Sequence, residues 1–434
     1  MKDKLEAQIR FLFDSWVDEL NKEVSHQEKV RYAGPVLDKE EYGGILDALF
    51  SNWWSGGAIT YDAERSLAKM SDRNHGLLTN SGSSANLILM EAAKELYFKE
   101  GDKILTLSCG FPTTVNPIIS SRLVPVFVDI DLDTLNLSPE VLDEALTKDP
   151  DIKGVFVAHT LGFKSDIKAL LEVVRRHKVE IFFDCCDAYG TLYEGSPIQS
   201  YGKASSFSFY VAHHLTMGEG GGVVTNDQDL HAVMRGYRNW GRYCASPNCC
   251  IRSKDPSLFC PPTKLSKSCD LPSDYIVNYQ YEWMGYNLKP LEMQSAMLSA
   301  QIPKLEKFND IRRKNYDRLL NYIKTQEGIR TWDIDEETSP FAFPMLIEDA
   351  PFNRKHMADA LQRSGIETRV LFGGNLMRHP AYANKKHLWE SIGSHSNADN
   401  IAENFIMLGV SPVNDSKKID KVIESLDSFF KKWR

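Results

Sequence analysis

Short β-rich runs alternate with amphipathic helical stretches from about residue 76 onward in this chain of 434 residues. Strands and helices in this alternation predict a mostly parallel sheet that helices cover on both faces. The runs that predict its strands are GLLTN, KILTLS, VPVFVDID, GVFVAHT, VEIFFDC, SSFSFY and GGVVTN. A second set of α/β runs, beginning with FAFPMLIE, lies near the C-terminus. We therefore expect an α/β protein with a large doubly wound domain and a smaller C-terminal α/β domain.

The same pattern divides the chain into three parts. Residues 1–60 are predicted as an N-terminal helical segment, residues 61–300 as the large domain and residues 301–434 as the small domain. Residues 244–279 break the alternation with five prolines and five cysteines, which predicts an irregular insertion. The formal net charge is −8, and no apolar stretch is long enough to span a bilayer. We therefore expect no nucleic-acid or membrane partner and a cytoplasmic location.

Two motifs fall where strands of this sheet end. The segment TNSGSSANL places Ser83 and Ser84 at the start of a helix, where free N–H groups and the helix dipole favour a phosphate. Ser and Gly are also ordinary N-cap residues, so this motif alone is weak. In FFDCCDAYG, Asp184 closes an apolar strand at the edge where open α/β sheets bind ligands. The Asp184 carboxylate either caps a following helix or meets a cationic group.

A third motif, SFSFYVAHHLTMGEGGG, joins a strand to a glycine turn that requires close backbone approach or positive φ. In this order the three motifs resemble the fold-type I pyridoxal phosphate (PLP) enzymes, and most closely the DegT-type sugar aminotransferases. In that family a lysine before G-E-G-G carries the cofactor covalently, and His213 takes its place here. Histidine has no primary amine to form that bond, but its imidazole moves protons near neutral pH.

The same substitution is typical of the nucleotide-sugar 3-dehydratase branch of the family, which the chain resembles along nearly its whole length. The motifs are SFYVAHHLTMGEGG, NSGSSANL, CGFPTTVNP, DCCDAYG, GYNLKPLEMQ and FGGNLMRHPAY. The resemblance implies dehydration and deoxygenation at C3 of a nucleotide-linked 4-keto-6-deoxyhexose in deoxysugar biosynthesis, with pyridoxamine 5'-phosphate (PMP) as cofactor. It is greatest to the enzymes of CDP-linked 6-deoxy-4-hexuloses, which add a 2Fe-2S cluster and an electron-donating flavin and iron–sulfur reductase.

The resemblance also implies the cofactor contacts. Asp184 matches the aspartate that hydrogen-bonds the pyridine nitrogen, and Phe111 matches an aromatic residue that stacks on the ring. The expected phosphate contacts are Ser83, Ser84, Ser208 and, from the second subunit of a homodimer, Asn287. The expected catalytic residues are His213 as acid and base, Asp187 facing the cofactor's ring oxygen, and Tyr210. His214 is expected to point away from the cofactor, because neighbouring residues of an extended segment face opposite sides.

The cysteines match the cluster pattern Cys-x57-Cys-x-Cys-x7-Cys only in part. Cys186 and Cys244 have 57 residues between them, but the next two positions fall on Ser246 and Lys254. We therefore predict that the insertion supplies the remaining ligands, Cys250 and Cys260, with Cys249 and Cys269 as substitutes. The alternatives are a four-cysteine zinc site across residues 244–269 and cysteines that are merely small buried residues.

Two other functions stay open at this level. One is a 3-dehydratase without a cluster that regenerates PMP from glutamate, and the other is an inactive relative that binds the cofactor as a regulator. Asn375 and Arg378 lie in a run that resembles a substrate-facing loop. Arg378 is either a contact for the substrate diphosphate or a solvated surface charge.

Overall fold

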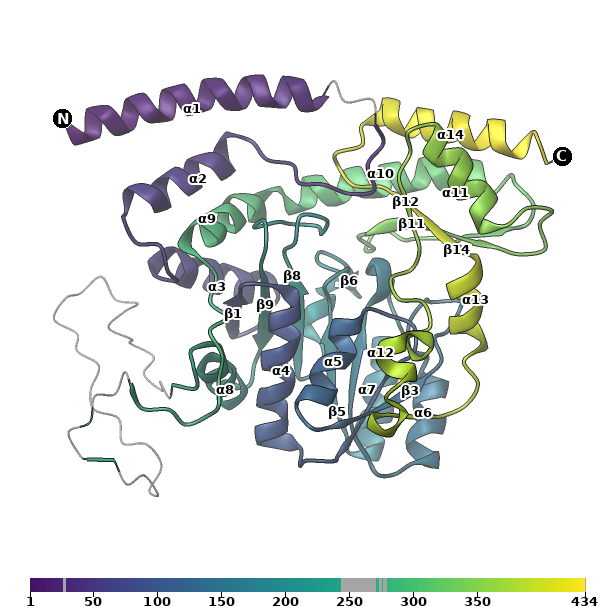
Figure 1. Cartoon of the computed structure of the whole chain (residues 1–434), viewed down its shortest axis with the longest axis horizontal. Helices are drawn as coiled ribbons and strands as arrows, with labels where there is room; N and C mark the ends of the chain where they lie inside the picture. The colour runs from purple at the N-terminus through teal and green to yellow at the C-terminus, as the bar shows by residue number, and fades with distance from the viewer. Residues whose placement is uncertain (26–28, 243–270, 273–274, 276–278, 434) are drawn as a thin grey trace.

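The computed structural model describes residues 1–25, 29–242, 271–272, 275 and 279–433. The chain begins with three helices, α1 (Lys2–Ser25), α2 (Lys39–Phe50) and α3 (Ala58–Met70). Helix α1 lies at the top of the molecule in Figure 1, and its Phe13 and Trp16 rings contact Tyr42 of α2. None of the helices in these described ranges has the length and hydropathy needed to cross a membrane.

A sheet of eight strands forms the centre of the large domain, in the order β1-β9-β8-β5-β4-β2-β3-β13. Only β9 runs antiparallel to its neighbours among these pairings, so the sheet is mostly parallel, as the alternation predicts. The strands are β1 (His75–Thr79), β2 (Lys103–Leu107), β3 (Val124–Val128), β4 (Ile152–Ala158), β5 (Glu180–Asp184), β8 (Ala204–Ser208), β9 (Gly221–Thr225) and β13 (Glu390–Ser391).

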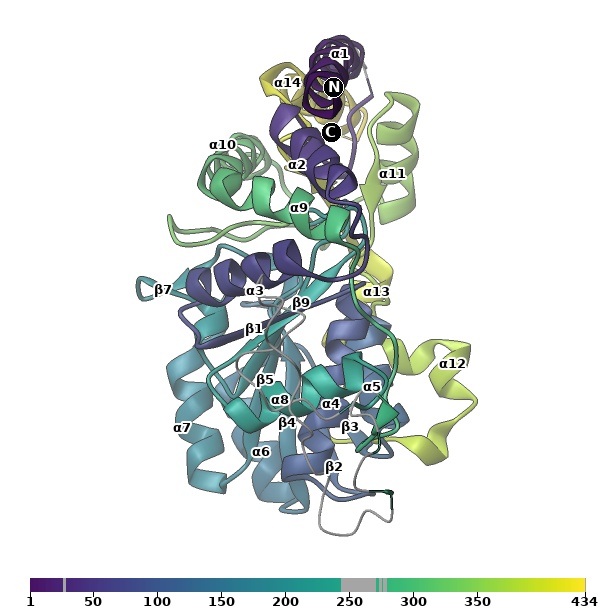
Figure 2. The ribbon, with the colours of Figure 1, turned by 90° about the vertical axis from the view of Figure 1, so that its left-hand side faces the viewer.

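Helices cover both faces of this sheet (Figure 2). One face carries α4 (Gly82–Tyr97), α5 (Pro112–Ser120) and α8 (Gln228–Arg238), and the other carries α6 (Pro139–Lys148) and α7 (Ile167–His177). Strand β5 shows why its sequence is almost wholly apolar. Phe182 packs into the core beneath α4 and α8, whereas Phe183 packs into the core on the opposite face. A hairpin of β6 (Leu192–Tyr193) and β7 (Ser196–Pro197) follows β5.

The small domain holds an antiparallel sheet in the order β10-β11-β14-β12. Its strands are β10 (Ile329–Arg330), β11 (Ala342–Ile347), β12 (Thr368–Arg369) and β14 (Phe405–Gly409). Its helices are α11 (Arg354–Arg363), α13 (Ser396–Asn404) and α14 (Ser416–Phe430). Helices α9 (Glu292–Gln301) and α10 (Leu305–Ile323) run from one domain toward the other (Figure 1). The C-terminal part also contributes α12 (Pro380–Ala383) and sends β13 back to pair with β3 of the large sheet.

Candidate active site

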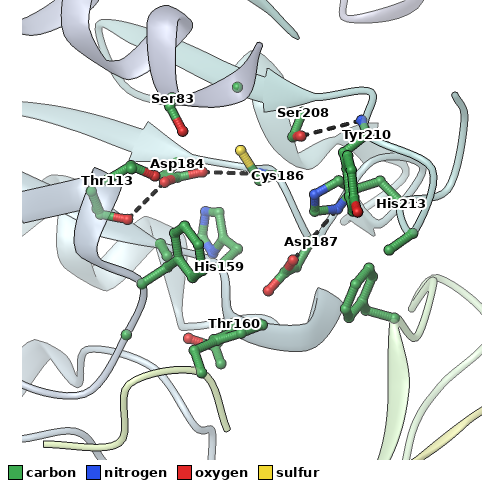
Figure 3. A pocket seen from close by; sticks show the side chains of 18 of the residues that line it. Ser83, Thr113, His159, Thr160, Asp184, Cys186, Asp187, Ser208, Tyr210 and His213 are labelled. Carbon is green, nitrogen blue, oxygen red and sulfur yellow. Dashed lines mark hydrogen bonds and ion pairs between the residues drawn. The ribbon is translucent and has the colours of Figure 1, made fainter. Parts of the chain in front are cut away.

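A cavity of about 530 Å³ lies at the carboxyl ends of β4, β5 and β8, between the large and the small domain (Figure 3). This is the edge at which open α/β sheets bind ligands. Its large-domain wall includes Ser83, Phe111, His159, Asp184, Cys186, Asp187, Ser208, Tyr210 and His213. Tyr32, Phe341, Arg369, Val370, Phe372 and Met407 complete it from the small-domain side.

Asp184 is the last residue of β5 and is almost fully buried. Its Oδ2 accepts hydrogen bonds from the Asn86 amide and the Thr114 hydroxyl, both at 2.8 Å, and its Oδ1 accepts one from the Cys186 N–H at 3.1 Å. Three donors fix the orientation of the carboxylate. Residues 185–191 form turns rather than a helix, so the helix-cap alternative for Asp184 is wrong.

The N-terminus of α4 comes very close to the ends of β8 and β9. A Cβ on Gly82 would lie 2.6 Å from the Ser208 Cβ, and one on Gly221 would lie 2.4 Å from the Ser81 carbonyl oxygen. Glycine at both positions therefore brings Ser83 and Ser208 to one end of the cavity. Ser208 Oγ accepts from the Tyr210 N–H at 3.3 Å.

Ser84 lies differently from Ser83. Its N–H donates to the hydroxyl oxygen of the N-cap residue Ser81 at 3.0 Å, and its own hydroxyl oxygen accepts from the Ser81 hydroxyl at 2.9 Å. Ser84 is not among the residues that line the cavity. Asn287 also lies outside the cavity of its own chain, where its Oδ1 accepts from Lys289 Nζ at 2.7 Å. Its expected contact from a second subunit stays a prediction.

His213 lines the cavity beside Asp187, with 3.7 Å between its Nδ1 and Asp187 Oδ1. Burial and, to a smaller extent, the charge of Arg312 lower the pKa of His213 to about 3. Burial and, to a smaller extent, the charge of Asp184 raise the pKa of Asp187 to about 8. Near neutral pH the cavity therefore holds a neutral imidazole beside a protonated carboxyl group.

His214 points away from the cavity, and its Nε2 lies 3.1 Å from the Ser339 carbonyl oxygen. The reason differs from the expected one, because residues 209–216 turn instead of extending and the His213 N–H donates to the Tyr210 carbonyl at 3.0 Å. Tyr210 and Phe111 line the cavity with partly exposed rings. The Phe111 ring meets Phe372 of the small domain edge-on, at a centroid distance of 6.0 Å.

Cys186 is the one cysteine, within the described ranges, that lines the cavity. Burial and the adjacent Asp184 raise the pKa of its thiol. The other expected cluster ligands and their substitutes, Cys244, Cys250, Cys260, Cys249 and Cys269, lie outside the described residues.

Two cavity neighbours escaped the sequence reasoning. His159 follows β4, is buried against Phe183 at a centroid distance of 4.6 Å, and has no hydrogen-bond partner on either ring nitrogen among the described residues. Its place after the run GVFVA is the same signal that identified Asp184. Arg312 of α10 is fully buried behind His213, where it donates to the carbonyl oxygens of Phe341 and His213 at 3.1 and 3.3 Å. No local pattern in the sequence predicts that Arg312 lies beside the candidate site.

Arg378 does not face this cavity. Its guanidinium pairs with Asp399 and Glu403 of α13 at 3.2 and 3.1 Å, and it lines a separate depression of about 360 Å³ together with Asn375. The Asn375 amide also donates to Asp399. The charge of Arg378 is therefore already engaged within the chain.

The fold, with its cavity at the carboxyl ends of the parallel strands, places the protein in the class of fold-type I PLP-type proteins. The chain belongs to the DegT/DnrJ/EryC1/StrS aminotransferase family, whose model matches residues 35–427. The expected family and fold class are therefore confirmed.

Named relatives also support the resemblance to the nucleotide-sugar 3-dehydratase branch. The lipopolysaccharide biosynthesis protein RfbH of Salmonella typhimurium is 34% identical, over 92% of this chain and 91% of its own length. The dTDP-4-dehydro-2,6-dideoxy-D-glucose 3-dehydratase of Saccharopolyspora spinosa is 32% identical, over 93% and 87%. A crystal structure of the GDP-4-keto-6-deoxymannose-3-dehydratase ColD, a mutant form with bound GDP-perosamine, superposes with a TM-score of 0.81 at 25% identity. It covers 92% of this chain and 100% of ColD.

Proposed function

We propose that this protein is a PMP-dependent dehydratase that removes the C3 hydroxyl of a nucleotide-linked 4-keto-6-deoxyhexose. The observation that carries this proposal is the position of His213. It lies in the cavity beside Asp187, where aminotransferases of the family have their cofactor-bearing lysine. Relatives whose names state a nucleotide-sugar 3-dehydratase activity support it, as does a solved structure of the E. coli GDP-4-keto-6-deoxy-D-mannose-3-dehydratase with bound hydrated PLP.

The residues present fit the cofactor. Asp184 offers a fixed anion for a protonated pyridine nitrogen, because three donors hold its carboxylate in place. Ser83 lies in the first turn of α4, where a phosphate is favoured, and Ser208 at the end of β8 lies close to this turn. The exposed ring of Phe111 provides a stacking surface. When bound, PMP supplies an amine that condenses with the C4 ketone and a ring that accepts electrons.

Side chains of this protein then accept and donate the protons. With PMP bound, an imidazole nitrogen of His213 would be available to accept a proton from the carbon that bears the amine, because the lowered pKa keeps the ring neutral. The same nitrogen can return that proton to the departing C3 oxygen. Asp187 lies beside the ring as a protonated carboxyl group, with its Oδ1 3.7 Å from the His213 Nδ1. Arg312 holds the His213 backbone from behind.

The proposal includes a 2Fe-2S cluster held by Cys186, Cys244, Cys250 and Cys260, which would supply single electrons from a flavin and iron–sulfur reductase. The position of Cys186 in the cavity wall, two residues after Asp184, supports it, since thiolate is the ligand that such clusters take. It also includes a homodimer, with Asn287 reaching the partner's cavity, and a cytoplasmic location.

The test of the reaction uses the protein loaded with PMP and offered CDP-, dTDP- and GDP-linked 4-keto-6-deoxyhexoses in deuterated water. We expect hydrogen exchange at the cofactor's amine-bearing carbon with one of them. Exchange with none of them would favour the inactive regulator.

The test of the cluster is an iron, sulfide and zinc assay with a visible spectrum on anaerobically purified protein. We expect iron and sulfide in equal amounts, lost in Cys186→Ser but kept in the buried control Cys109→Ser. Zinc without sulfide would support the zinc alternative. Protein without metal that regains PMP from glutamate would support the cluster-free dehydratase.

A further inference from the structure

Tyr32 lines the cavity although it lies before residue 35, where the match to the family model begins. It belongs to the segment between α1 and α2, for which the sequence predicts no functional role. The large domain supplies the groups suited to the cofactor, whereas Tyr32 approaches from the small-domain side, together with Arg369 of β12.

Main-chain and side-chain hydrogen bonds tie this segment to the small domain. The Val30 N–H donates to the Gly365 carbonyl and the Glu367 N–H donates to the Val30 carbonyl, both at 3.0 Å. The Tyr32 N–H donates to the Glu367 carboxylate at 3.1 Å. Asn414 bonds both the N–H and the carbonyl oxygen of Arg31, at 3.2 and 2.7 Å. Tyr32 is therefore held on a rigid support.

The ring of Tyr32 lies one side chain away from His213. It meets Phe341 edge-on at a centroid distance of 5.9 Å, and Phe341 in turn packs against the His213 ring at 5.2 Å. The guanidinium of Arg369 lies over the Tyr32 ring, 5.2 Å from its centroid. Phe341 and Arg369 therefore both contact the Tyr32 ring and restrict its position.

The hydroxyl of Tyr32 is buried and has no hydrogen-bond partner among the described residues. Burial raises its pKa, and the neighbouring Asp187 adds to the shift, so the hydroxyl stays protonated and is a hydrogen-bond donor. A buried polar group left without a partner costs about 1–3 kcal/mol. A ligand oxygen in the cavity would remove that cost.

We propose that Tyr32 binds the sugar of the substrate through its hydroxyl, with Arg369 facing the diphosphate. This inference rests on the proposed function. A 4-keto-6-deoxyhexose offers keto, hydroxyl and ring oxygens as acceptors. Arg369 is the one Arg or Lys, in the part of the chain that the structure describes, that lines the cavity. Its guanidinium has a long ion pair with Glu367, at 3.7 Å, and its half-exposed side chain is placed to meet a more solvated group.

The experiment compares Tyr32→Phe with wild type and with Tyr42→Phe, which removes a hydroxyl from α2 outside the cavity. Calorimetry measures the binding of two ligands to the PMP-loaded protein: the nucleotide sugar that wild type accepts, and the same nucleoside diphosphate without sugar. Tyr32→Phe should weaken nucleotide-sugar binding roughly 3- to 10-fold, the range for one lost hydrogen bond, and leave nucleoside diphosphate binding unchanged. Arg369→Gln should weaken both, and Tyr42→Phe neither.

The melting temperature of the ligand-free protein separates binding from structure. The melting temperature should stay the same or rise in Tyr32→Phe, because removal of the hydroxyl leaves no other buried polar group without a hydrogen bond. A lower melting temperature, or unchanged nucleotide-sugar binding, would overturn the inference while the proposed function stands. Wild type that binds none of the CDP-, dTDP- and GDP-linked sugars would overturn both.

Discussion

Asp184→Asn is the most informative perturbation of the candidate site, because its size can be worked out from the hydrogen bonds. All three groups around the carboxylate are donors: the Asn86 amide, the Thr114 hydroxyl and the Cys186 N–H. An asparagine side chain has one acceptor oxygen and one NH₂ group. In either orientation of the amide, at least one of the three donors therefore faces another donor.

A hydrogen bond to a charged group contributes about 1.5–3 kcal/mol, so the ligand-free variant should lose about 2–3 kcal/mol of unfolding free energy. The variant also lacks the anion for the pyridine nitrogen. We expect PMP to bind roughly 10- to 100-fold more weakly, which corresponds to the loss of one charge-assisted hydrogen bond.

Urea denaturation of the ligand-free protein measures the first effect, and absorbance titration with PMP measures the second. The control is Asp415→Asn at the N-cap of α14, which should be neutral because asparagine caps helices as well as aspartate does. Wild-type stability together with wild-type PMP affinity in Asp184→Asn would refute both the hydrogen-bond reasoning and the assignment of Asp184 to the cofactor.

Three further predictions concern protons and charge. His213→Lys should form a covalent link to added PLP that borohydride reduces to a stable adduct, because burial keeps part of the lysine unprotonated. Mass spectrometry should find no such adduct in wild type, and a wild-type adduct on another lysine would contradict the site. Asp187 has its pKa raised from 3.8 to about 8, so the folded state keeps a proton that the unfolded chain loses, and stability falls as pH rises between these values. His213, whose pKa is lowered from 6.5, opposes this only below about pH 6.5. Wild type should therefore lose stability relative to Asp187→Asn in urea between pH 6.5 and 8, and parallel curves would argue against the raised pKa. Arg238→Met should lower the free energy of unfolding by about 3 kcal/mol or more in the same assay, because it leaves the buried Glu64 carboxylate without its ion pair. Adding Glu64→Gln should restore the stability, and failure to restore it would show that the lost packing of the Arg238 side chain matters more than the lost ion pair.

Much of the fold is predictable from the sequence, because apolar periodicity and strand-ending residues are local signals. The run IFFD reads as a strand buried on both faces, and Phe182 and Phe183 do pack into opposite cores. Strand β13 has no such signal, since its two residues are exposed and its partner β3 lies more than 250 positions earlier. The antiparallel direction of β9 likewise depends on its neighbours, not on its composition.

The sequence by itself determined the edge of the sheet that carries chemistry and the absence of a lysine at position 213. Both follow from residues that are close together along the chain: a strand, its last polar side chain and the turn after it. Only the tertiary structure decided what surrounds the imidazole. Phe341 packs against the His213 ring, and burial together with the charge of Arg312 lowers the pKa of that ring, although both residues come from segments far from His213 in the sequence. Such values depend on distances through space, which no local pattern of residues encodes.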